Sequence, residues 1–204
     1  MSYTRQIRKH FLYNLAGMKE TIILKNDLSI IVRELQKDDQ EQLYNYFSKL
    51  SAATKSRFGP HPFDRDTVRN ICNESASDII RYVAVNEHQE IIAYMLIKKG
   101  MNEGEQYRLR QNNVAFDESL FCTFAPSVAD AWQSSGLGSA MYGIIENDIR
   151  INTPYKFIIL WGGVQASNEK AVRFYEKQGF QYVGSFWYDG KDNYDMIKNL
   201  YNLG

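Results

Sequence analysis

A glycine turn between a strand pattern and a helical pattern constrains the fold most. Residues 118–128 are predicted to form a strand, and a helical period runs from near 137 to 150. The run QSSGLGS lies between them at 133–139. Glycines let the backbone approach a ligand closely, and free N–H groups at the start of a helix bind anions. A phosphate group is therefore the expected ligand. Met141 stands where a dinucleotide fingerprint needs a third glycine, and the Gly-Lys-Ser/Thr of a phosphate-loop NTPase is absent.

The rest of the chain alternates strand and helix patterns without a linker that would divide it. Residues 99–117 are polar, and we interpret them as a mobile surface loop, with a substrate lid as the alternative. A β-rich half followed by β-α-β-α-β-β favours a mixed sheet flanked by helices. The predicted strands are 28–35, 79–86, 90–98, 118–128, 157–161, 180–188 and 192–199, and the predicted helices are 38–50, 64–73, 137–150 and 168–178.

Composition excludes several classes of protein. The chain has 204 residues, and its 24 Lys and Arg balance 24 Asp and Glu, so no sequence-wide positive field favours nucleic acid. Cys72 and Cys122 fit no disulfide framework, and the three histidines lie far apart, so neither a disulfide nor a metal site is expected. The sequence shows neither an apolar run of about 18 residues nor a secretory signal, so we expect no stable membrane insertion and a cytoplasmic location.

The first residues form a separate pattern. Tyr3, Ile7, Phe11 and Leu15 recur every four residues with basic residues between them, which predicts a short amphipathic helix within an N-terminal extension at 1–27. Such a helix could bind a membrane surface, direct the chain to an organelle, dock a partner, or pack on its own domain or on a second subunit. A homodimer is compatible with the sequence.

A second motif, NEKAVRFYEKQGF, occupies residues 168–180. Asn168 is predicted to cap the helix, and Tyr175 follows two turns later near the same face. Both side chains can therefore face one ligand.

Together the two motifs resemble the GNAT N-acetyltransferase superfamily. Its pyrophosphate loop, Gln/Arg-x-x-Gly-x-Gly/Ala, is matched by Gln133, Gly136 and Gly138. Its Asn-x-x-Ala-x-x-Phe-Tyr-x-x-x-Gly-Phe segment is matched from Asn168 to Phe180. The resemblance covers roughly residues 28–199, assigned to one domain at 28–204, and the front part looks like the catalytic domain of bacterial protein-lysine acetyltransferases.

The resemblance implies an α/β (α+β) fold with a mixed, mostly antiparallel sheet of about six to seven strands, splayed between 118–128 and 157–161. Acetyl-CoA, the cosubstrate, would enter the gap, and no metal is needed. Pro126 has no N–H, so pantetheine amides are expected to pair with Ser127 or Val128. The implied cofactor-binding residues are Ser127, Val128, Gln133, Ser134, Ser135, Gly136, Leu137, Gly138, Ser139 and Asn168.

The implied reaction moves an acetyl group to a primary amine by direct transfer in a ternary complex. Tyr175 would be the general acid, because a phenol with a pKa of about 10 stays protonated at neutral pH. Many members of the family carry a Glu ten residues before the loop glutamine, but here Thr123 stands there and cannot act as a base. Thr123, Ala125 and Ser127 alternate on one face suited to a ligand, and Cys122 is expected in the core on the other.

Several alternatives stay open. A water chain or an already neutral amine could replace the missing base, while Asp117, Glu118 and Asp130 are more typical of solvated carboxylates. The chain could also be a catalytically silent GNAT-fold module that binds CoA, or an interaction protein that works through its N-terminal helix. Protein lysine, a protein N-terminus, a polyamine, an amino acid and an aminoglycoside are all candidate acceptors.

Overall fold

One mixed sheet organises the chain, and a computed structural model describes residues 18–24, 27–74 and 78–201. Within these residues nine strands join in the order β1-β2-β3-β4-β5-β6-β9-β7, with β8 on β9. Among the described strands, only β5 and β6 pair in parallel. The strands are β1 (Lys19–Ile23), β2 (Ser29–Glu34), β3 (Ile79–Val85), β4 (Ile91–Lys99), β5 (Phe121–Val128), β6 (Phe157–Leu160), β7 (Val164–Gln165), β8 (Gln181–Tyr188) and β9 (Lys191–Asn199).

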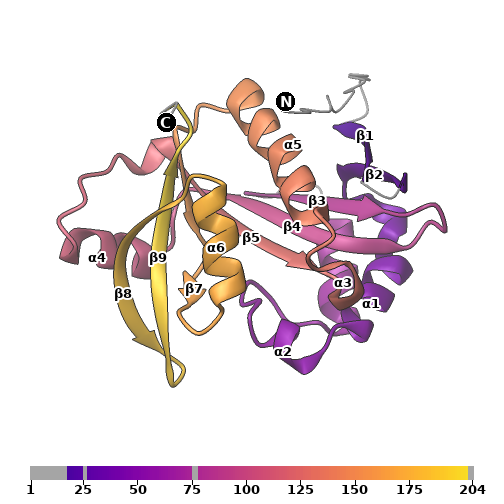
Figure 1. The fold of residues 1–204 in the computed structure, drawn as a ribbon, viewed down its shortest axis with the longest axis horizontal. Helices are drawn as coiled ribbons and strands as arrows, with labels where there is room; N and C mark the ends of the chain where they lie inside the picture. Colours follow the sequence, from indigo (N-terminus) through magenta and orange to yellow (C-terminus); the bar gives the residue numbers. More distant parts are fainter. Residues whose placement is uncertain (1–17, 25–26, 75–77, 202–204) are drawn as a thin grey trace, which may run out of the picture.

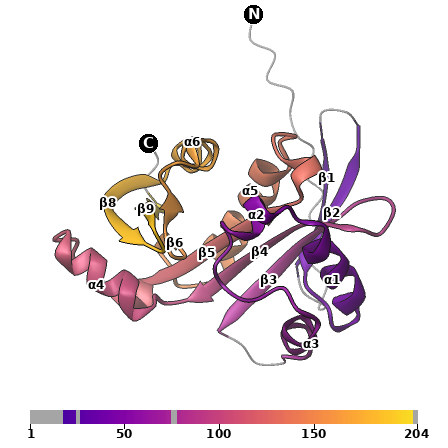
Figure 2. The ribbon, with the colours of Figure 1, turned by 90° about the horizontal axis from the view of Figure 1, so that it is seen from below.

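Helices cover both faces of this sheet (Figures 1 and 2). The residues of α5 and α6 pack in one apolar cluster with one face of the strands, and those of α1 and α3 pack in a second cluster on the other face. The helices are α1 (Gln40–Lys49), α2 (Ala52–Lys55), α3 (Arg65–Asn73), α4 (Glu103–Gln111), α5 (Leu137–Asn152) and α6 (Glu169–Lys177), with 3-10 turns η1 (Lys37–Asp39), η2 (Glu118–Leu120) and η3 (Asp130–Trp132).

The predicted fold class is confirmed, with more strands than the expected six to seven. The two that the sequence pattern does not predict are β1 and the two-residue β7. Strand β1 pairs with β2 and falls within the predicted extension at 1–27, so Lys19–Ile23 belongs to the sheet. The amphipathic helix predicted for residues 3–15 lies outside the described residues. In the described part of the chain, no helix is long and apolar enough to cross a bilayer.

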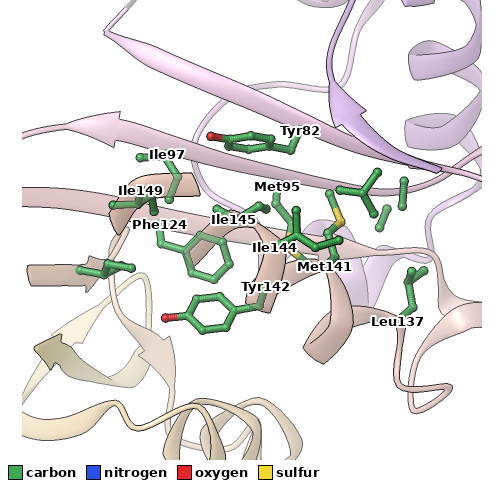
Figure 3. Close-up of a cluster of buried hydrophobic side chains, with 14 of the residues drawn as sticks. Tyr82, Met95, Ile97, Phe124, Leu137, Met141, Tyr142, Ile144, Ile145 and Ile149 are labelled. Carbon is green, nitrogen blue, oxygen red and sulfur yellow. The ribbon is translucent and has the colours of Figure 1, made fainter. Parts of the chain in front are cut away.

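Helix α5 anchors the larger core. Leu137, Met141, Tyr142, Ile144, Ile145 and Ile149 recur at helical spacing and are all buried. They meet side chains from β3, β4 and β5, including Tyr82, Met95 and Phe124 (Figure 3). Because burying each large apolar side chain stabilises the fold by about 1.5–3 kcal/mol, this stripe fixes the helix rigidly behind the glycine turn.

The prediction of an irregular loop at 99–117 is wrong, because α4 forms there. Asn102 caps the helix by accepting from the Glu105 N–H at 2.8 Å, and the Glu105 carboxylate accepts from the Asn102 N–H at 2.9 Å. Arg108 ties the helix to β9 through Asp195, with an Nε–Oδ2 distance of 2.7 Å, and stacks on Phe186 of β8. Tertiary contacts therefore hold a segment whose polar sequence suggests a loop.

Candidate active site

The parallel pairing of β5 and β6 stops abruptly at Trp161. Its N–H donates to the Phe124 carbonyl at 2.9 Å. In a parallel ladder the next bond would run from the N–H of residue 126 to the Trp161 carbonyl, but Pro126 has no N–H. Beyond this point β5 pairs with β4 alone, from Ala125 to Val128. The missing donor thus opens the edge of β5 where the resemblance predicts the splay.

Alternation along β5 decides which backbone groups face this open edge. The Phe124 carbonyl points to β6, so the Pro126 carbonyl and the Val128 N–H point the same way. Ala129 donates to Ile92 of β4, which places the backbone of Ser127 on the β4 side. The Ser127 hydroxyl is 2.8 Å from the Tyr46 hydroxyl. Of the two expected partners for pantetheine, Val128 therefore presents its N–H to the gap and Ser127 does not.

The glycine turn forms an exposed helix start. Gly136 is left-handed at φ 93°, and the first bond within α5 runs from the Ala140 N–H to the Gly136 carbonyl at 3.0 Å. The N–H groups of Gly138 and Ser139 precede that bond and have no acceptor in the described part of the chain. A Cβ on Gly136 would meet nothing within 4 Å. The turn therefore has the open N–H groups and the space that an anionic group needs.

Side chains brace this turn against α2. Gln133 Nε2 donates to Thr54 Oγ1 at 3.2 Å and to the Val128 carbonyl at 3.3 Å. Asp130 accepts from the Ser51 N–H at 2.9 Å, and from the hydroxyls of Ser51 and Thr54 at 2.7 Å each. These hydrogen bonds, led by the Ser51 N–H, hold the pKa of Asp130 below its ordinary value. Asp130 is thus a structural acceptor, and α2 is a part of the site that the sequence motifs do not reveal.

Tyr175 lies on α6 in a largely apolar setting. Its ring centroid is 5.2 Å from that of Phe174 and 5.5 Å from that of Phe180, and 7% of the residue is exposed. Burial raises the pKa of Tyr175 above the ordinary phenol value, so the hydroxyl is protonated at neutral pH. Among the residues that the structure describes, no group hydrogen-bonds to this hydroxyl. A protonated hydroxyl without a protein partner is available to donate to a ligand.

Asn168 stands at the N-cap of α6, but its side chain makes no capping bond. Its carbonyl accepts from the N–H groups of Ala171 and Val172 at 2.9 and 3.0 Å, and the helix starts from these bonds. The side-chain cap expected from the sequence is therefore not formed, and the Asn168 amide is left for another partner.

The face of β5 that carries Thr123, Ala125 and Ser127 is covered. All three residues are buried, whereas the sequence suggests a ligand-facing surface. The Thr123 hydroxyl donates to the Gly100 carbonyl at 2.7 Å and lies 3.4 Å from Glu105 Oε2. Cys122 is in the opposite core as expected, and burial raises the pKa of its thiol. Glu105 is the carboxylate that the motifs miss, because no local pattern brings 105 to 123.

A sheet parted between two parallel strands, with an open helix start at one end of the gap, is the arrangement that the resemblance to acetyltransferases implies. The sequence model of the Acetyltransferase (GNAT) family matches residues 41–180, more than half of the chain. The chain belongs to this family. No curated protein sequence matches the chain. Within the described residues, no group of three or more His, Cys, Asp or Glu side chains could hold a metal ion.

Solved structures share the fold. The GNAT domain of S. lividans PAT is 19% identical, with a TM-score of 0.70 over 89% of this chain and 96% of that one. A spermidine N-acetyltransferase chimera of Vibrio cholerae SpeG and hSSAT is 18% identical, with a TM-score of 0.61 over 84% and 95%. AAC(6')-Ib, solved with paromomycin and acetyl-CoA, is 17% identical, with a TM-score of 0.63 over 83% and 93%. The first of these also carries the likeness to protein acetyltransferases.

Proposed function

We propose that the chain is an acetyl-CoA-dependent N-acetyltransferase that acts on a primary amine by direct transfer in a ternary complex. The observation that carries this proposal is the open edge of β5 at Pro126 and Val128, which leads to the unpaired N–H groups at the start of α5. An amide-bearing arm with a diphosphate at one end fits both features. The chain's family and the amine-acetylating enzymes among its structural relatives support the same reaction class.

In this proposal the Val128 N–H and the Pro126 carbonyl pair with the amides of the pantetheine arm. The diphosphate lies against the loop from Ser134 to Ser139, where the N–H groups of Gly138 and Ser139 have no acceptor in the described part of the chain, and Gln133 and Asp130 keep that loop in place. The Asn168 side chain, which makes no cap, faces the same ligand. The charge of the diphosphate is met by N–H dipoles, so no metal is required.

The reaction joins a neutral amine nitrogen to the thioester carbonyl carbon and breaks the carbon–sulfur bond. Tyr175 donates its phenolic proton to the departing thiolate and regains a proton from the nitrogen, which becomes the amide. An acceptor that arrives as an ammonium ion first loses one proton to water. Thr123 stands where many members of the family carry an acid. Its hydroxyl donates to the Gly100 carbonyl, and it takes no proton in this reaction.

A second candidate is a CoA-binding module without transfer. It is favoured by one observation, namely that Thr123 replaces the acid and is tied to the backbone. This candidate shares the cofactor site with the first and differs only in turnover.

Incubation of the purified chain with acetyl-CoA and a panel of amines separates the two candidates. The panel holds spermidine, a lysine-containing peptide with a blocked N-terminus, a peptide with a free N-terminus, a free amino acid and an aminoglycoside. Release of free CoA thiol that depends on the amine, together with acetylated product in the mass spectrum, is the expected result. Binding of acetyl-CoA without release for any amine would favour the silent module.

A further inference from the structure

Glu105 is a fully buried carboxylate on helix α4, with 0% of its surface exposed. Its capping contact with the Asn102 N–H uses one oxygen, Oε2. The other oxygen, Oε1, accepts from the Gly162 N–H at 3.0 Å. The helix cap therefore accounts for the contact between Oε2 and the Asn102 N–H. It does not account for the hydrogen bond between Oε1 and the Gly162 N–H.

Gly162 is the residue at which the chain leaves the parallel ladder. It follows Trp161, the last residue to bond with β5. Gly162 and Gly163 both have positive φ, at 65° and 70°, and the Gly163 N–H turns back to the Leu160 carbonyl at 3.2 Å. In this turn the Gly162 N–H does not bond to β5 and donates to Glu105 instead.

We propose that Glu105 is a positioning residue for the acyl-transfer site, whose carboxylate fixes the turn at 161–163 in place beside the open edge of β5. The same side chain touches β5 itself through Thr123, so it spans the two strands where they part. Pro126 removes the bond that would close the gap, and Glu105 keeps the opposite wall in place. This inference rests on the proposed function, because it assigns Glu105 to the gap that acetyl-CoA would enter.

Charged and polar groups surround the buried Glu105 carboxyl group. Burial raises the pKa of Glu105, while the N–H groups of Asn102 and Gly162 and the charges of Arg108 and Lys98 partly offset that rise. Arg108 is already paired with Asp195 of β9. The Lys98 ammonium lies 5.3 Å from the centre of the Trp161 ring, over the turn that Glu105 holds. The carboxyl group is thus buried next to Gly162, where the chain leaves the parallel ladder, and Figure 2 shows α4 near the start of β5.

The substitution Glu105→Gln tests the proposal, with Glu103→Gln as the matched control. Glutamine keeps the shape of the side chain but offers an NH2 group where one backbone N–H needs an acceptor. Glu103 lies two residues away on the same helix and is exposed. We expect Glu105→Gln to raise the Kd and KM for acetyl-CoA by about tenfold, with the KM for the amine unchanged, and Glu103→Gln to match the parent protein.

The outcomes are distinguishable. If the parent protein binds no acetyl-CoA, the proposed function fails. If the parent binds and turns over while Glu105→Gln only lowers the unfolding midpoint and keeps the parent Kd, Glu105 is a structural cap and the positioning role is overturned.

A second measurement covers the case in which Glu105→Gln does not fold. Saturating acetyl-CoA should then slow hydrogen exchange in parent-protein peptides that cover residues 161–164, and leave α3 peptides unchanged. Unchanged exchange at 161–164 would also overturn the proposal.

Discussion

Replacing Gly138 by alanine should move stability and acetyl-CoA affinity in opposite directions. Gly138 is the second residue of α5, and a Cβ there would lie 3.8 Å from Phe174 and 3.8 Å from Val128, which is ordinary contact. The substitution is therefore sterically tolerated, and removing a helical glycine stabilises the fold by about 0.5–1 kcal/mol. For a domain of this size the unfolding midpoint should rise by about 1–4 °C.

The same methyl group should weaken the binding of acetyl-CoA. It would stand between Val128 and Phe174, beside the N–H groups that we assign to the diphosphate. Loss of one hydrogen bond to a charged group costs about 1.5–3 kcal/mol, so the Kd should rise about 10- to 150-fold. Titration calorimetry with acetyl-CoA measures the Kd, and thermal unfolding without ligand measures stability.

Gly143→Ala is the matched control for this experiment. Gly143 is exposed farther along α5, and a Cβ there would meet nothing within 4 Å. The control should be stabilised by about 1 kcal/mol and keep the parent Kd. A Gly138→Ala protein that binds acetyl-CoA as tightly as the Gly143→Ala control would refute the placement of the diphosphate at this turn.

Three further predictions test other parts of the account. Tyr175→Phe should lower kcat at saturating acetyl-CoA by about 100-fold or more and leave its Kd nearly unchanged; equal turnover would remove Tyr175 from the acid role. Gly163→Ala should destabilise the fold by about 2–5 kcal/mol in denaturant titrations, because its Cβ would lie 2.7 Å from the Tyr194 carbonyl at a φ of 70°. Gly162→Ala, which has open space at a φ of 65°, should cost only about 1–2 kcal/mol, and equal losses at the two positions would contradict the contact argument. Burial lowers the pKa of His61, so the unfolded chain binds the proton more tightly and stability should fall as the pH drops below about 6.5. His61→Gln should flatten that limb of the curve of unfolding free energy against pH, and a substitution of the exposed His88 should not.

Local patterns were sufficient to predict the elements around the glycine turn. The apolar stripe of α5 repeats with helical period over 16 residues, and it packs on the strands as such a stripe must. The sequence shows that Pro126 lacks an N–H and predicts that it lies at a bulge or at the splay, and the end of the pairing between β5 and β6 decides for the splay. The choice of Val128 over Ser127 as the backbone partner of pantetheine required the pairing of β5 with β4.

Helix α4 could not be predicted in the same way. The ion pair that stabilises this helix joins Arg108 to Asp195, which are 87 residues apart in sequence. No helical repeat of apolar residues indicates the helix. One local signal exists, the Asn102 and Glu105 spacing of a capping box. The burial of Glu105 depends on Gly162, 57 residues away, so its place beside the gap follows from the fold alone.

Thermal unfolding with and without acetyl-CoA tests the central claim most directly, with NAD as the negative control. At about 100 times its Kd a ligand stabilises the folded state by about 2.7 kcal/mol. For a chain of this size the midpoint should therefore rise by about 5–11 °C with acetyl-CoA, and NAD should leave it unchanged. An unchanged midpoint at millimolar acetyl-CoA would contradict the assignment of the gap and the glycine turn to this cosubstrate.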